Sequence, residues 1–557
     1  MGFSRREILK GMGAAGLTPL IVSTGCGSDD GGSSGPPLPE LPEYEWNGEL
    51  GPETLFKHGV ASGDPLAEAV VIWTRISSED APEEPPESDD PLEVWWEVSL
   101  DEAFTQRVAQ GTLRADPARD FTVKVDVTGL VWGRNYFYRF LAQGRQSPIG
   151  RTRLAPKGDE TDRLRFGVCS CSNYGFGYFH GYRHMAERND LDAVLHLGDY
   201  FYEYGQDNYP DPGPDRLRLV EPPTDTVTLS DYRIRFAQYR EDEDLQECHR
   251  QHPFIVVWDD HESANNSWMG GAENHDEATQ GSWDDRLASA REAFFEWIPI
   301  REDAAVNPNR ELYRSFKYGD LANIIMLDTR IEGREEQGPL ITVIPDSPNN
   351  PENIISETQE AWLKEQLSSS TAQWRIIGNQ VVMSLWQFVD QNTNEVTYVN
   401  QDQWNGYPVG RARLLEYLRD NQISNVVVVT GDVHSSWSMD VTVGDGSYDP
   451  ETGEGAVAVE FVAPGITSPF EVPDFIVGVF VEQSPHIYYS DVANRGYLVL
   501  DVQADKVQSD WYFVEGLQQD QVGQTLAASW AVLDGTAHVI EMDGEEAPNA
   551  DAPPRAS

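Results

Sequence analysis

The stretch NVVVVT at residues 425–430 runs directly into GDVH at residues 431–434, and this junction indicates the fold. An uninterrupted run of Val is typical of a strand that is buried on both faces of a sheet. Ligands of such sheets bind just beyond the carboxyl ends of the strands. We therefore expect Asp432 and His434 to lie at the edge of a buried sheet, where they can reach a ligand.

Four further apolar runs end in the same way, each followed at once by polar or metal-ligating side chains. They are LRFGV at 164–168 before CSC at 169–171, AVLHL at 193–197 before GDYFYE at 198–203, FIVVW at 254–258 before DDHE at 259–262, and NIIML at 323–327 before DTR at 328–330. Because the carboxyl ends of parallel strands meet at one edge, all five groups are expected to converge on one crevice. This recurrence indicates a hydrolase.

The composition is that of a globular protein with a strongly acidic surface. Hydrophobic residues make up 39% of the 557 residues, which allows two or three domains and a large core. The 93 acidic and 41 basic residues give a formal net charge of −52, which excludes a nucleic-acid-binding surface. Such a charge fits a saline habitat, and it fits equally well an acidic exported protein without salt adaptation.

The first residues resemble an export signal. SRREILK at residues 4–10 precedes a weakly apolar stretch that is too short to span a membrane, as in a twin-arginine signal. Cys26 follows Gly25 and precedes a Gly- and Ser-rich segment, as in a lipoprotein processing site. We predict a signal over residues 1–26 and a linker over 27–52. The twin-arginine translocase would be a partner, and the location would be periplasmic, extracellular or lipid-anchored, with membrane attachment only through Cys26.

Residues 53–155 are predicted to form a small immunoglobulin-like β-sandwich. Short segments of alternating apolar side chains are separated by turn residues, and they lie at 70–74, 92–98, 121–127 and 135–140. Leu130 and Tyr136 flank a Trp-Gly turn, as in the tyrosine corner of such domains, where the phenol bonds back to the backbone.

Residues 160–540 are predicted to form a layered α/β domain, in which strands alternate with helices. Apolar residues recur at helical spacing in 359–367 and 410–418. The loops at 205–230, 266–285 and 331–352 are longer than ordinary connections, and we expect some of them to frame the mouth of the site. Residues 541–557, rich in Glu, Pro and Ala, are predicted to be a flexible tail.

The residues after the strands suit a multinuclear metal hydrolase. Asp199 can bridge two cations that fix and activate a water. His261, between two carboxylates, can then protonate the leaving group. Arg330 can clamp a phosphate through its guanidinium, or it can form a structural ion pair. Arg183, Arg235 and Arg240 are alternative candidates for the clamp.

The order of these motifs resembles that of the PhoD-like alkaline phosphatase and phosphodiesterase family, of the metallophosphoesterase superfamily. The likeness covers nearly the whole chain after the signal. It rests on HGVASGDP at 58–65, the Ser170-Cys171 turn, GDYFYE at 198–203, WDDHE at 258–262, DTR at 328–330, WNGYP at 404–408, GDVH at 431–434 and NRGY at 494–497. The resemblance implies a metallophosphoesterase-like sheet domain with helices, preceded by the β-sandwich.

The resemblance also implies one Fe³⁺ and two Ca²⁺. The residues that correspond to the iron ligands are Cys171, Asp199, Tyr202 and Asp432. A thiolate and a phenolate are anionic donors that suit a trivalent iron. The turn carries Cys169 as well as Cys171, and its alignment with Asn173-Tyr174 favours Cys171.

The implied calcium ligands are oxygen or nitrogen donors. Asp199 would bridge from iron to calcium, and Asp260 would bind calcium directly. Asn265 or His434 would complete the coordination.

The activity implied by the resemblance is hydrolysis of phosphomonoesters and phosphodiesters by an exported enzyme. The alternatives are a phospholipase D-type phosphodiesterase, a surface-anchored binding protein without activity, and an iron redox protein. Asp199, His261 and Asp432 argue against the binding protein, because a site without activity has no physical reason to keep mutually repelling carboxylates together.

Overall fold

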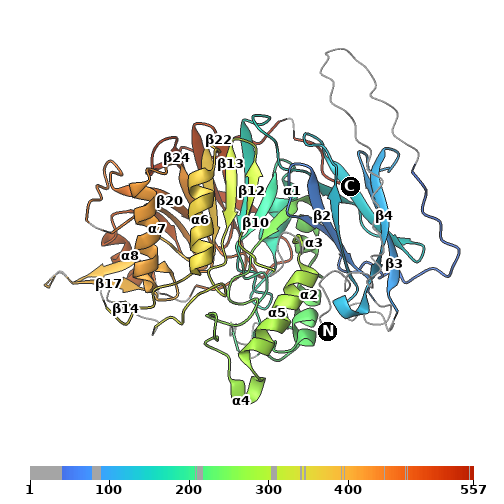
Figure 1. Cartoon of the computed structure of the whole chain (residues 1–557), viewed down its shortest axis with the longest axis horizontal. Coiled ribbons are helices and arrows are strands. Elements are labelled where there is room, and N and C mark those ends of the chain that lie inside the picture. The colour runs from blue at the N-terminus through green and yellow to red at the C-terminus, as the bar shows by residue number, and fades with distance from the viewer. Residues whose placement is uncertain are drawn as a thin grey trace, which may run out of the picture.

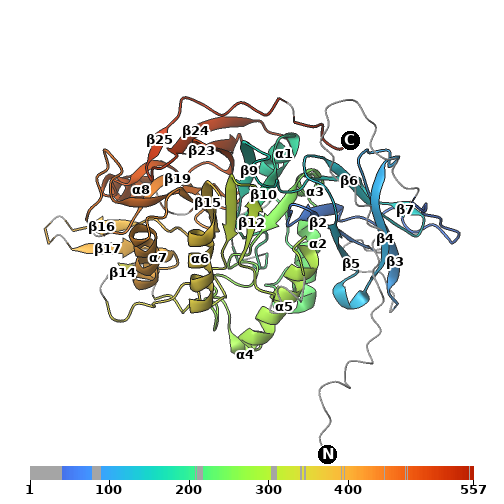
Figure 2. The ribbon, with the colours of Figure 1, turned by 45° about the horizontal axis from the view of Figure 1, so that its top comes forward.

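Two large β-sheets and the helices that cover them make up most of the computed structural model of this chain (Figures 1 and 2). It describes residues 41–77, 90–206, 208–209, 217–302, 310–338, 342–343, 347–390, 392–393, 395–444, 446–470, 472, 474–550 and 552–557. The predicted signal 1–26 with Cys26, and most of the linker 27–52, lie outside the described residues.

The five apolar runs all form strands, as predicted. β9 (Arg163–Cys169), β10 (Ala193–His196) and β11 (Pro253–Val256) are parallel neighbours in one sheet. β13 (Ala322–Met326) and β18 (Val426–Thr430) belong to the other sheet, where both pair in parallel with the strand between them. The carboxyl ends of these strands therefore point to common edges.

The alternation of side chains along β18 explains its uninterrupted Val run. Val427 and Val429 pack against the ten-stranded sheet, whereas Val426 and Val428 pack against helices. Because both faces of the strand are buried, neither alternate position can be polar.

The sheet that contains β9 has ten strands in the order β25-β24-β23-β22-β9-β10-β11-β1-β2-β5, and the other has seven in the order β12-β13-β15-β18-β20-β19-β21. The bounds of their remaining strands are β1 (Val60–Gly63), β2 (Ala69–Arg75), β5 (Thr122–Thr128), β12 (Arg314–Tyr318), β15 (Trp374–Asn379), β19 (Ser436–Thr442), β20 (Ala456–Val462), β21 (Ile487–Asp491), β22 (Gly496–Gln503), β23 (Lys506–Val514), β24 (Gln524–Leu533) and β25 (Val539–Glu541).

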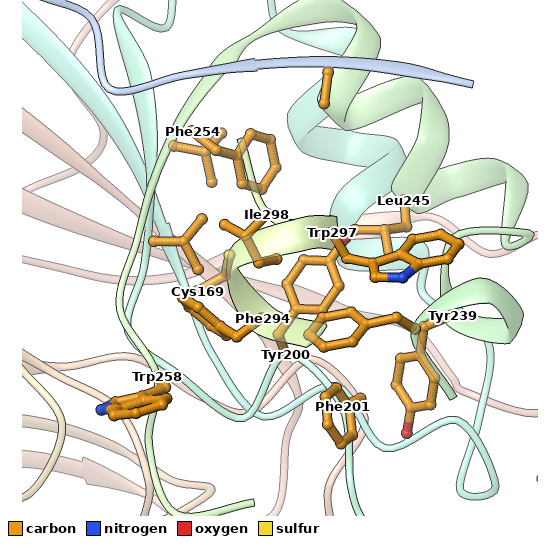
Figure 3. Packing of buried hydrophobic residues seen from close by; sticks show 14 of the residues in the cluster. Cys169, Tyr200, Phe201, Tyr239, Leu245, Phe254, Trp258, Phe294, Trp297 and Ile298 are labelled. Carbon is orange, nitrogen blue, oxygen red and sulfur yellow. The ribbon is translucent and has the colours of Figure 1, made fainter. Parts of the chain in front are cut away.

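Three apolar cores hold four layers together. The core between the sheets includes Val168, Leu195 and Ile376. A second core, which includes Phe294 and Trp297, packs helices on the outer face of the ten-stranded sheet (Figure 3). A third packs helices on the seven-stranded sheet. The arrangement is a layered α/β domain, as predicted.

The helices on the ten-stranded sheet are α1 (His180–Glu187), α2 (Leu229–Tyr239), α3 (Glu243–Gln251) and α5 (Trp283–Trp297), with the short α4 (Glu277–Gln280) before α5. Those on the seven-stranded sheet are α6 (Glu357–Ser369) and α7 (Pro408–Asp420), which confirm the helices predicted at 359–367 and 410–418. Ser356 caps α6, since its Oγ accepts a 3.0 Å hydrogen bond from the backbone N–H of Gln359.

The N-terminal strands form a β-sandwich, but it shares a sheet with the rest of the chain, which differs from the prediction of a separate unit over 53–155. β1, β2 and β5 extend the ten-stranded sheet, because β1 pairs in parallel with β11. The opposing sheet, β4-β3-β6-β7 with β8 paired to β6, packs on them through a common core. A period-two pattern identifies a strand but not its partner, so the sequence could not show the shared sheet.

The bounds of the opposing sheet are β3 (Leu92–Ser99), β4 (Arg107–Ala115), β6 (Tyr136–Ala142), β7 (Arg145–Gln146) and β8 (Gly150–Thr152). The tyrosine corner in this sheet is confirmed. Tyr136 donates from its hydroxyl to the carbonyl of Val131 at 2.8 Å and accepts from the N–H of the same residue at 2.9 Å.

The tail at residues 541–557, predicted to be flexible, is packed against the N-terminal strands instead. Arg151 donates to the carbonyls of Pro553 and Pro554 at 3.2 and 3.1 Å, and Gln251 Nε2 donates to the carbonyl of Ala556 at 3.0 Å. Both overall views place the C-terminal end beside these strands (Figures 1 and 2). The contacts are made mainly to backbone carbonyls, so the side-chain composition of the tail carried no sign of them.

A third, small sheet lies at the opposite end of the molecule from β3 and β4, next to α8 (Asp474–Glu482) (Figures 1 and 2). Its order is β14-β17-β16, with bounds β14 (Thr342–Val343), β16 (Gln387–Val389) and β17 (Val396–Val399). Across the described part of the chain, no helix is long and apolar enough to cross a membrane.

Candidate active site

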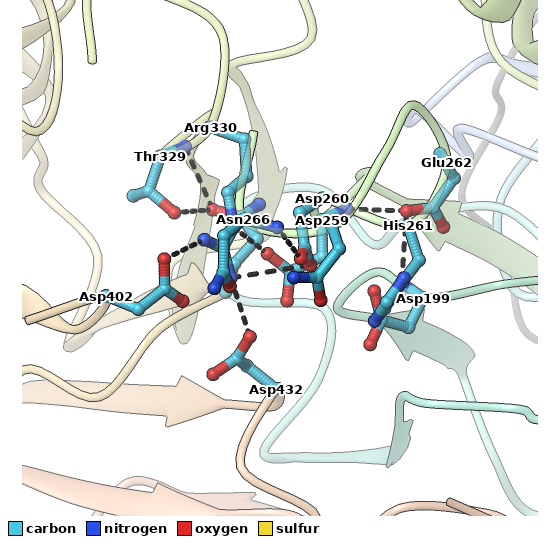
Figure 4. Close-up of polar contacts among 12 residues, drawn as sticks. Asp199, Asp259, Asp260, His261, Glu262, Asn266, Thr329, Arg330, Asp402 and Asp432 are labelled. Carbon is cyan, nitrogen blue, oxygen red and sulfur yellow. Dashed lines mark hydrogen bonds and ion pairs between the residues drawn. The ribbon is translucent and has the colours of Figure 1, made fainter. Parts of the chain in front are cut away.

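The polar residues that follow the five strands meet where the carboxyl ends of the two sheets come together (Figure 4). Cys171, Asp199, Asp432 and His434 all adopt a left-handed backbone, with φ of 61°, 52°, 62° and 52°. A residue with a Cβ pays a cost for this conformation, and such residues concentrate at functional sites. The chain thus turns sharply after β9, β10 and β18, so that the side chains that follow these strands point into the site.

Gly198 shows how closely two of these turns approach. A Cβ at this position would clash with the Cβ and backbone of Asp259, and the φ of Gly198 is +107°. Only glycine combines this conformation with so close a contact. The glycine before Asp199 therefore brings the loops after β10 and β11 together.

The first group of candidate ligands consists of Cys171, Asp199 and His434, whose donor atoms lie within 4.8 Å of one another. Tyr202 belongs with them, because its hydroxyl lies 2.9 Å from Asp199 Oδ2 and 2.8 Å from His434 Nε2. Cys169, the alternative thiol, is fully buried in the core beneath the helices and is not in the group. The structure thus brings together the four residues Cys171, Asp199, Tyr202 and His434.

Two further groups adjoin the first. One joins Asp199, Asp260 and His261, and the other joins Asp259, Asp260 and Asp432, with donor atoms again within 4.8 Å in each. Asp199 and Asp260 each belong to two groups. Shared carboxylates of this kind can bridge neighbouring cations.

The electrostatics of these groups also suit cations. Burial, opposed by Arg330 and assisted by Asp402, raises the pKa of Asp432 to about 7. Burial likewise raises the pKa of Asp259 well above its usual range. Burial acts against the charged form of Asp260 as well, but Arg330 and His261 outweigh it and lower the pKa of that carboxyl to about 2. Bound cations would relieve the repulsion among these carboxylates.

Three buried carboxylate oxygens in the described part of the site have no hydrogen-bond partner. They are Oδ1 of Asp199, Oδ2 of Asp259 and Oδ1 of Asp260. Leaving a buried acceptor unsatisfied is costly. Hard oxygen donors in this state are the ligands that divalent and trivalent cations take, so the residues present fit a metal centre.

Arg330 is an internal counter-ion of the site, and the phosphate clamp that the sequence allowed is not what the structure shows. Its side chain is 0% exposed. The guanidinium contacts Asp259 through Nε and donates to Asp402 and Asp432 at 2.6 Å each. Because its donors are occupied by carboxylates, this residue positions the acidic side chains and does not face substrate.

His261 is held in the cavity wall by a buried carboxylate. Its Nδ1 lies 2.6 Å from Glu203 Oε2, and its ring packs on that of Tyr202 with centroids 4.1 Å apart. Burial acts against the charged form, but Asp260, Glu203 and Asp199 outweigh it and raise the pKa of His261 well above its usual range. These neighbouring carboxylates favour the imidazolium form of the ring, which can donate a proton.

Glu262 organises the loops from below. Its carboxylate accepts hydrogen bonds from the backbone N–H groups of Asp199 at 3.1 Å, Tyr200 at 2.5 Å and Asp259 at 2.8 Å. The side chain is fully buried. One carboxylate thus fixes the turns after β10 and β11 relative to each other.

Asn265 lies in the wall of the same cavity, next to Asn266. Its backbone N–H donates to Glu203 at 2.7 Å, and its amide nitrogen donates to Glu273 at 3.0 Å. The amide oxygen is the atom that could serve a cation. Asn265 thus lines the same cavity as Asp199 and Asp260, and its role as a calcium ligand stays a prediction.

The sequence did not reveal three residues that complete the site. Gln403 Nε2 donates to Asp432 at 2.6 Å, Asp402 pairs with Arg330, and Ser468 Oγ lies 2.6 Å from the Tyr202 hydroxyl. None of them follows one of the five strands, because they come from the segment before α7 and from the loop after β20. Only the WNGYP motif at 404–408, directly after Gln403, pointed to that region.

These groups open into a cavity of about 390 Å³. Asp199, Asp260, His261, Asp432 and His434 line one part of it. Tyr209 and Asn266 also line it, which confirms that the loops at 205–230 and 266–285 frame the mouth. The volume suits a small ligand.

The fold and the site define a phosphoric ester hydrolase on a metallophosphoesterase-like fold. A purple acid phosphatase from yellow lupin shares the fold, with a TM-score of 0.53 at 13% identity over 85% of this chain and 73% of that chain. The chain belongs to the PhoD-like phosphatase family: the family model matches residues 166–511, and the model of its N-terminal domain matches residues 47–156.

Two relatives extend the match to nearly the full length. Alkaline phosphatase D of Bacillus subtilis (strain 168) is 35% identical over 529 residues, which cover 91% of this chain and 84% of that protein. A solved structure described as the structure of PhoD superposes with a TM-score of 0.80 at 32% identity, over 90% of this chain and 94% of that chain.

Proposed function

We propose that this chain is an exported, metal-dependent alkaline phosphatase and phosphodiesterase that hydrolyses phosphate esters with an activated water. The observation that carries the metal dependence is the set of three overlapping donor groups, linked by Asp199 and Asp260, with unsatisfied carboxylate oxygens inside them. One Fe³⁺ and two Ca²⁺ are the proposed cations.

The donor set separates into a softer and a harder end. Cys171 and Tyr202 supply a thiol and a phenol beside Asp199, and such donors suit Fe³⁺ when deprotonated. Burial, followed by the charge of Asp199, raises the pKa of both groups well above the usual range, so each needs a strong cation to lose its proton. Asp260 and Asn265 offer hard oxygen donors for Ca²⁺. Asp432, which the family resemblance assigns to iron, lies with Asp259 and Asp260 in the third donor group.

The cations, when bound, supply a water activated at neutral pH and neutralise the phosphoryl oxygens. The residues of the chain do the remaining work. Asp199 and Asp260 hold neighbouring positions for the cations, Arg330 keeps Asp259, Asp402 and Asp432 in place, and Glu203 orients His261. His261 then gives a proton to the leaving oxygen from Nε2, since Nδ1 is bonded to Glu203.

Turnover of p-nitrophenyl phosphate and bis-p-nitrophenyl phosphate tests this function. Protein folded with iron and calcium should hydrolyse both, calcium chelation should stop turnover, and Asp199→Asn should abolish it. Asp505→Asn, at an exposed turn between β22 and β23, is the matched control and should leave turnover unchanged. Chelation-resistant turnover would contradict the proposal.

The metal identity has a readout other than activity. Elemental analysis should find iron and calcium in the purified protein and less of both in Asp199→Asn. Iron phenolates and iron thiolates both absorb visible light, so Tyr202→Phe should remove the phenolate band and Cys171→Ser the thiolate band. A visible spectrum that is identical in Tyr202→Phe and the unmodified protein would show that Tyr202 does not bind iron.

Export through the twin-arginine translocase is proposed from SRREILK at residues 4–10 alone. A reporter fused to residues 1–52 should leave the cytoplasm, and replacing Arg5 and Arg6 by Lys should keep it inside. Cys26→Ala should release the reporter from the membrane fraction if Cys26 carries the lipid anchor. Retention that is independent of both changes would contradict the assignment.

A further inference from the structure

The cavity has a second side that the hydrolytic chemistry does not use. Besides the acidic residues it is lined by apolar side chains, Trp386, Phe388, Val399, Trp437, Phe470 and Phe480. We refer to these six residues as the apolar wall. They are contributed by the small sheet at β16 and β17, the start of β19, the loop before α8, and α8 itself.

The apolar wall is tightly packed. The rings of Trp386 and Trp437 lie 5.2 Å apart, and Phe480 meets Trp386 edge-on at 5.6 Å with an interplanar angle of 73°. Phe388 and Val399, by contrast, are only half-buried. The wall thus has a rigid aromatic base and partly open side chains that line the cavity.

The two sides favour opposite parts of a phosphate ester. The acidic side, with its cations, takes the phosphoryl group. The side chains of the wall offer aromatic and aliphatic carbon, so a sugar or glycerol placed against them would lose hydrogen bonds to water. A hydrocarbon group placed there would leave water, which is favourable, and would lose no hydrogen bonds.

We propose that the apolar wall binds the alcohol part of the substrate, and that this enzyme prefers phosphate esters whose alcohol carries a hydrocarbon chain or an aromatic ring. The inference rests on the proposed function, because it places the phosphoryl group at the acidic side. A cavity of about 390 Å³ holds a phosphoryl group with a short chain or one ring, near the small end of ligand sites.

A homologous series tests the preference. Ethyl, butyl and hexyl phosphate have alcohols of nearly equal acidity, so a change in kcat/KM along the series reports contact with the chain and not leaving-group chemistry. We expect kcat/KM to rise by up to about fourfold per buried methylene and to be lowest for glycerol 1-phosphate.

The same series of alkylphosphonates measures binding without turnover. Calorimetric Kd values should fall from ethyl- to hexylphosphonate with the same slope. Phenylphosphonate compared with hexylphosphonate distinguishes a ring-binding wall from a chain-binding wall.

Matched variants locate the effect. Phe388→Ala should flatten the series, whereas Gln387→Ala, on the neighbouring position of β16 and outside the wall, should keep its slope. Val477 is a further apolar residue of α8 that lines the cavity next to Phe480, so Val477→Thr should lower the gain for hexyl over ethyl. Val479 on the same helix is exposed, and Val479→Thr should leave the gain unchanged.

The outcomes separate the two proposals. Turnover of all esters with no dependence on chain length would overturn the apolar-wall inference and leave the phosphatase function standing. A chain-length dependence in phosphonate binding without turnover of any ester would support the wall and overturn the function. A slope that survives in both Phe388→Ala and Val477→Thr would also overturn the inference.

Discussion

Arg330 is a buried cation of the described site that pairs with several buried carboxylates, one of which, Asp402, also pairs with Arg334. It pairs with Asp259, Asp402 and Asp432 while being fully buried itself. Breaking a buried pair by removing one partner leaves uncompensated charge, which is far more costly than the pair's own contribution to stability. Removal of this one side chain would therefore leave Asp259 and Asp432 without their buried cationic partner.

We expect Arg330→Met to lower the free energy of unfolding of chelator-treated protein by about 3–5 kcal/mol. Urea unfolding followed by fluorescence measures it. Arg419→Met removes one side of an exposed pair with Asp420 and should cost less than about 1 kcal/mol. If both substitutions lowered the free energy of unfolding by the same amount, Arg330 would not be the stabilising counter-ion that we describe.

At the scale of residues, the sequence predicted the donors that directly follow strands. Asp199, Asp260 and Asp432 could be placed because each comes after a buried run, whereas Cys171 was chosen over Cys169 through the family resemblance. Asp402 and Gln403 could not, since their place depends on how the segment before α7 folds back toward Asp432. The role of Arg330 stayed open because a guanidinium suits phosphate and carboxylate equally well.

At the scale of elements, strands and helices with a strong local period could be predicted, and their pairing could not. The helical spacing at 359–367 and 410–418 marked α6 and α7, and the Val run marked β18. The parallel pairing of β1 with β11 joins segments far apart in the chain, so no local pattern reports it. The packed C-terminal segment escaped prediction for the related reason that its contacts use backbone carbonyls.

The C-terminal segment should stabilise the N-terminal strands without affecting chemistry. Deletion of residues 549–557 leaves Arg151 without the carbonyls of Pro553 and Pro554, and Gln251 without that of Ala556. It also removes Ala556 from its contact with Phe104 and Phe137, which leaves these two rings more exposed. We expect the Tm to fall by several degrees while kcat at 25 °C stays within twofold, since the segment lies far from the cavity lining. Loss of kcat with unchanged Tm would contradict this assignment.

At the scale of the whole molecule, buried neutral histidines contribute to the loss of folding stability at acid pH. Burial lowers the pKa of His486 to about 4, and its Nε2 lies 2.7 Å from the carbonyl of Leu385. The folded chain therefore binds fewer protons at this residue than the unfolded chain does. The part of the free energy of unfolding that depends on neutral His486 is fully present above the ordinary pKa of about 6.5. It is lost as pH falls from there toward about 4.

His486→Gln should remove this part of the acid sensitivity, because Gln can donate to Leu385 without titrating. Between pH 6.5 and pH 5 the free energy of unfolding of the variant should fall less steeply than that of the unmodified chain, by about 1 kcal/mol per pH unit on average. Urea midpoints measured from pH 8 to pH 5 give both slopes. Parallel curves would show that His486 is not the group involved.

The parallel pairing of β1 with β11 has a consequence for how the protein is made. On a ribosome, β1, which ends at Gly63, is synthesised long before β11, which begins at Pro253. Until β11 emerges, β1 is an exposed edge that can recruit strands of other nascent chains. Protection of that edge by a chaperone during synthesis would raise the yield of folded protein. A fragment that ends between residues 156 and 166 would lack β11, so the edge of β1 would stay exposed.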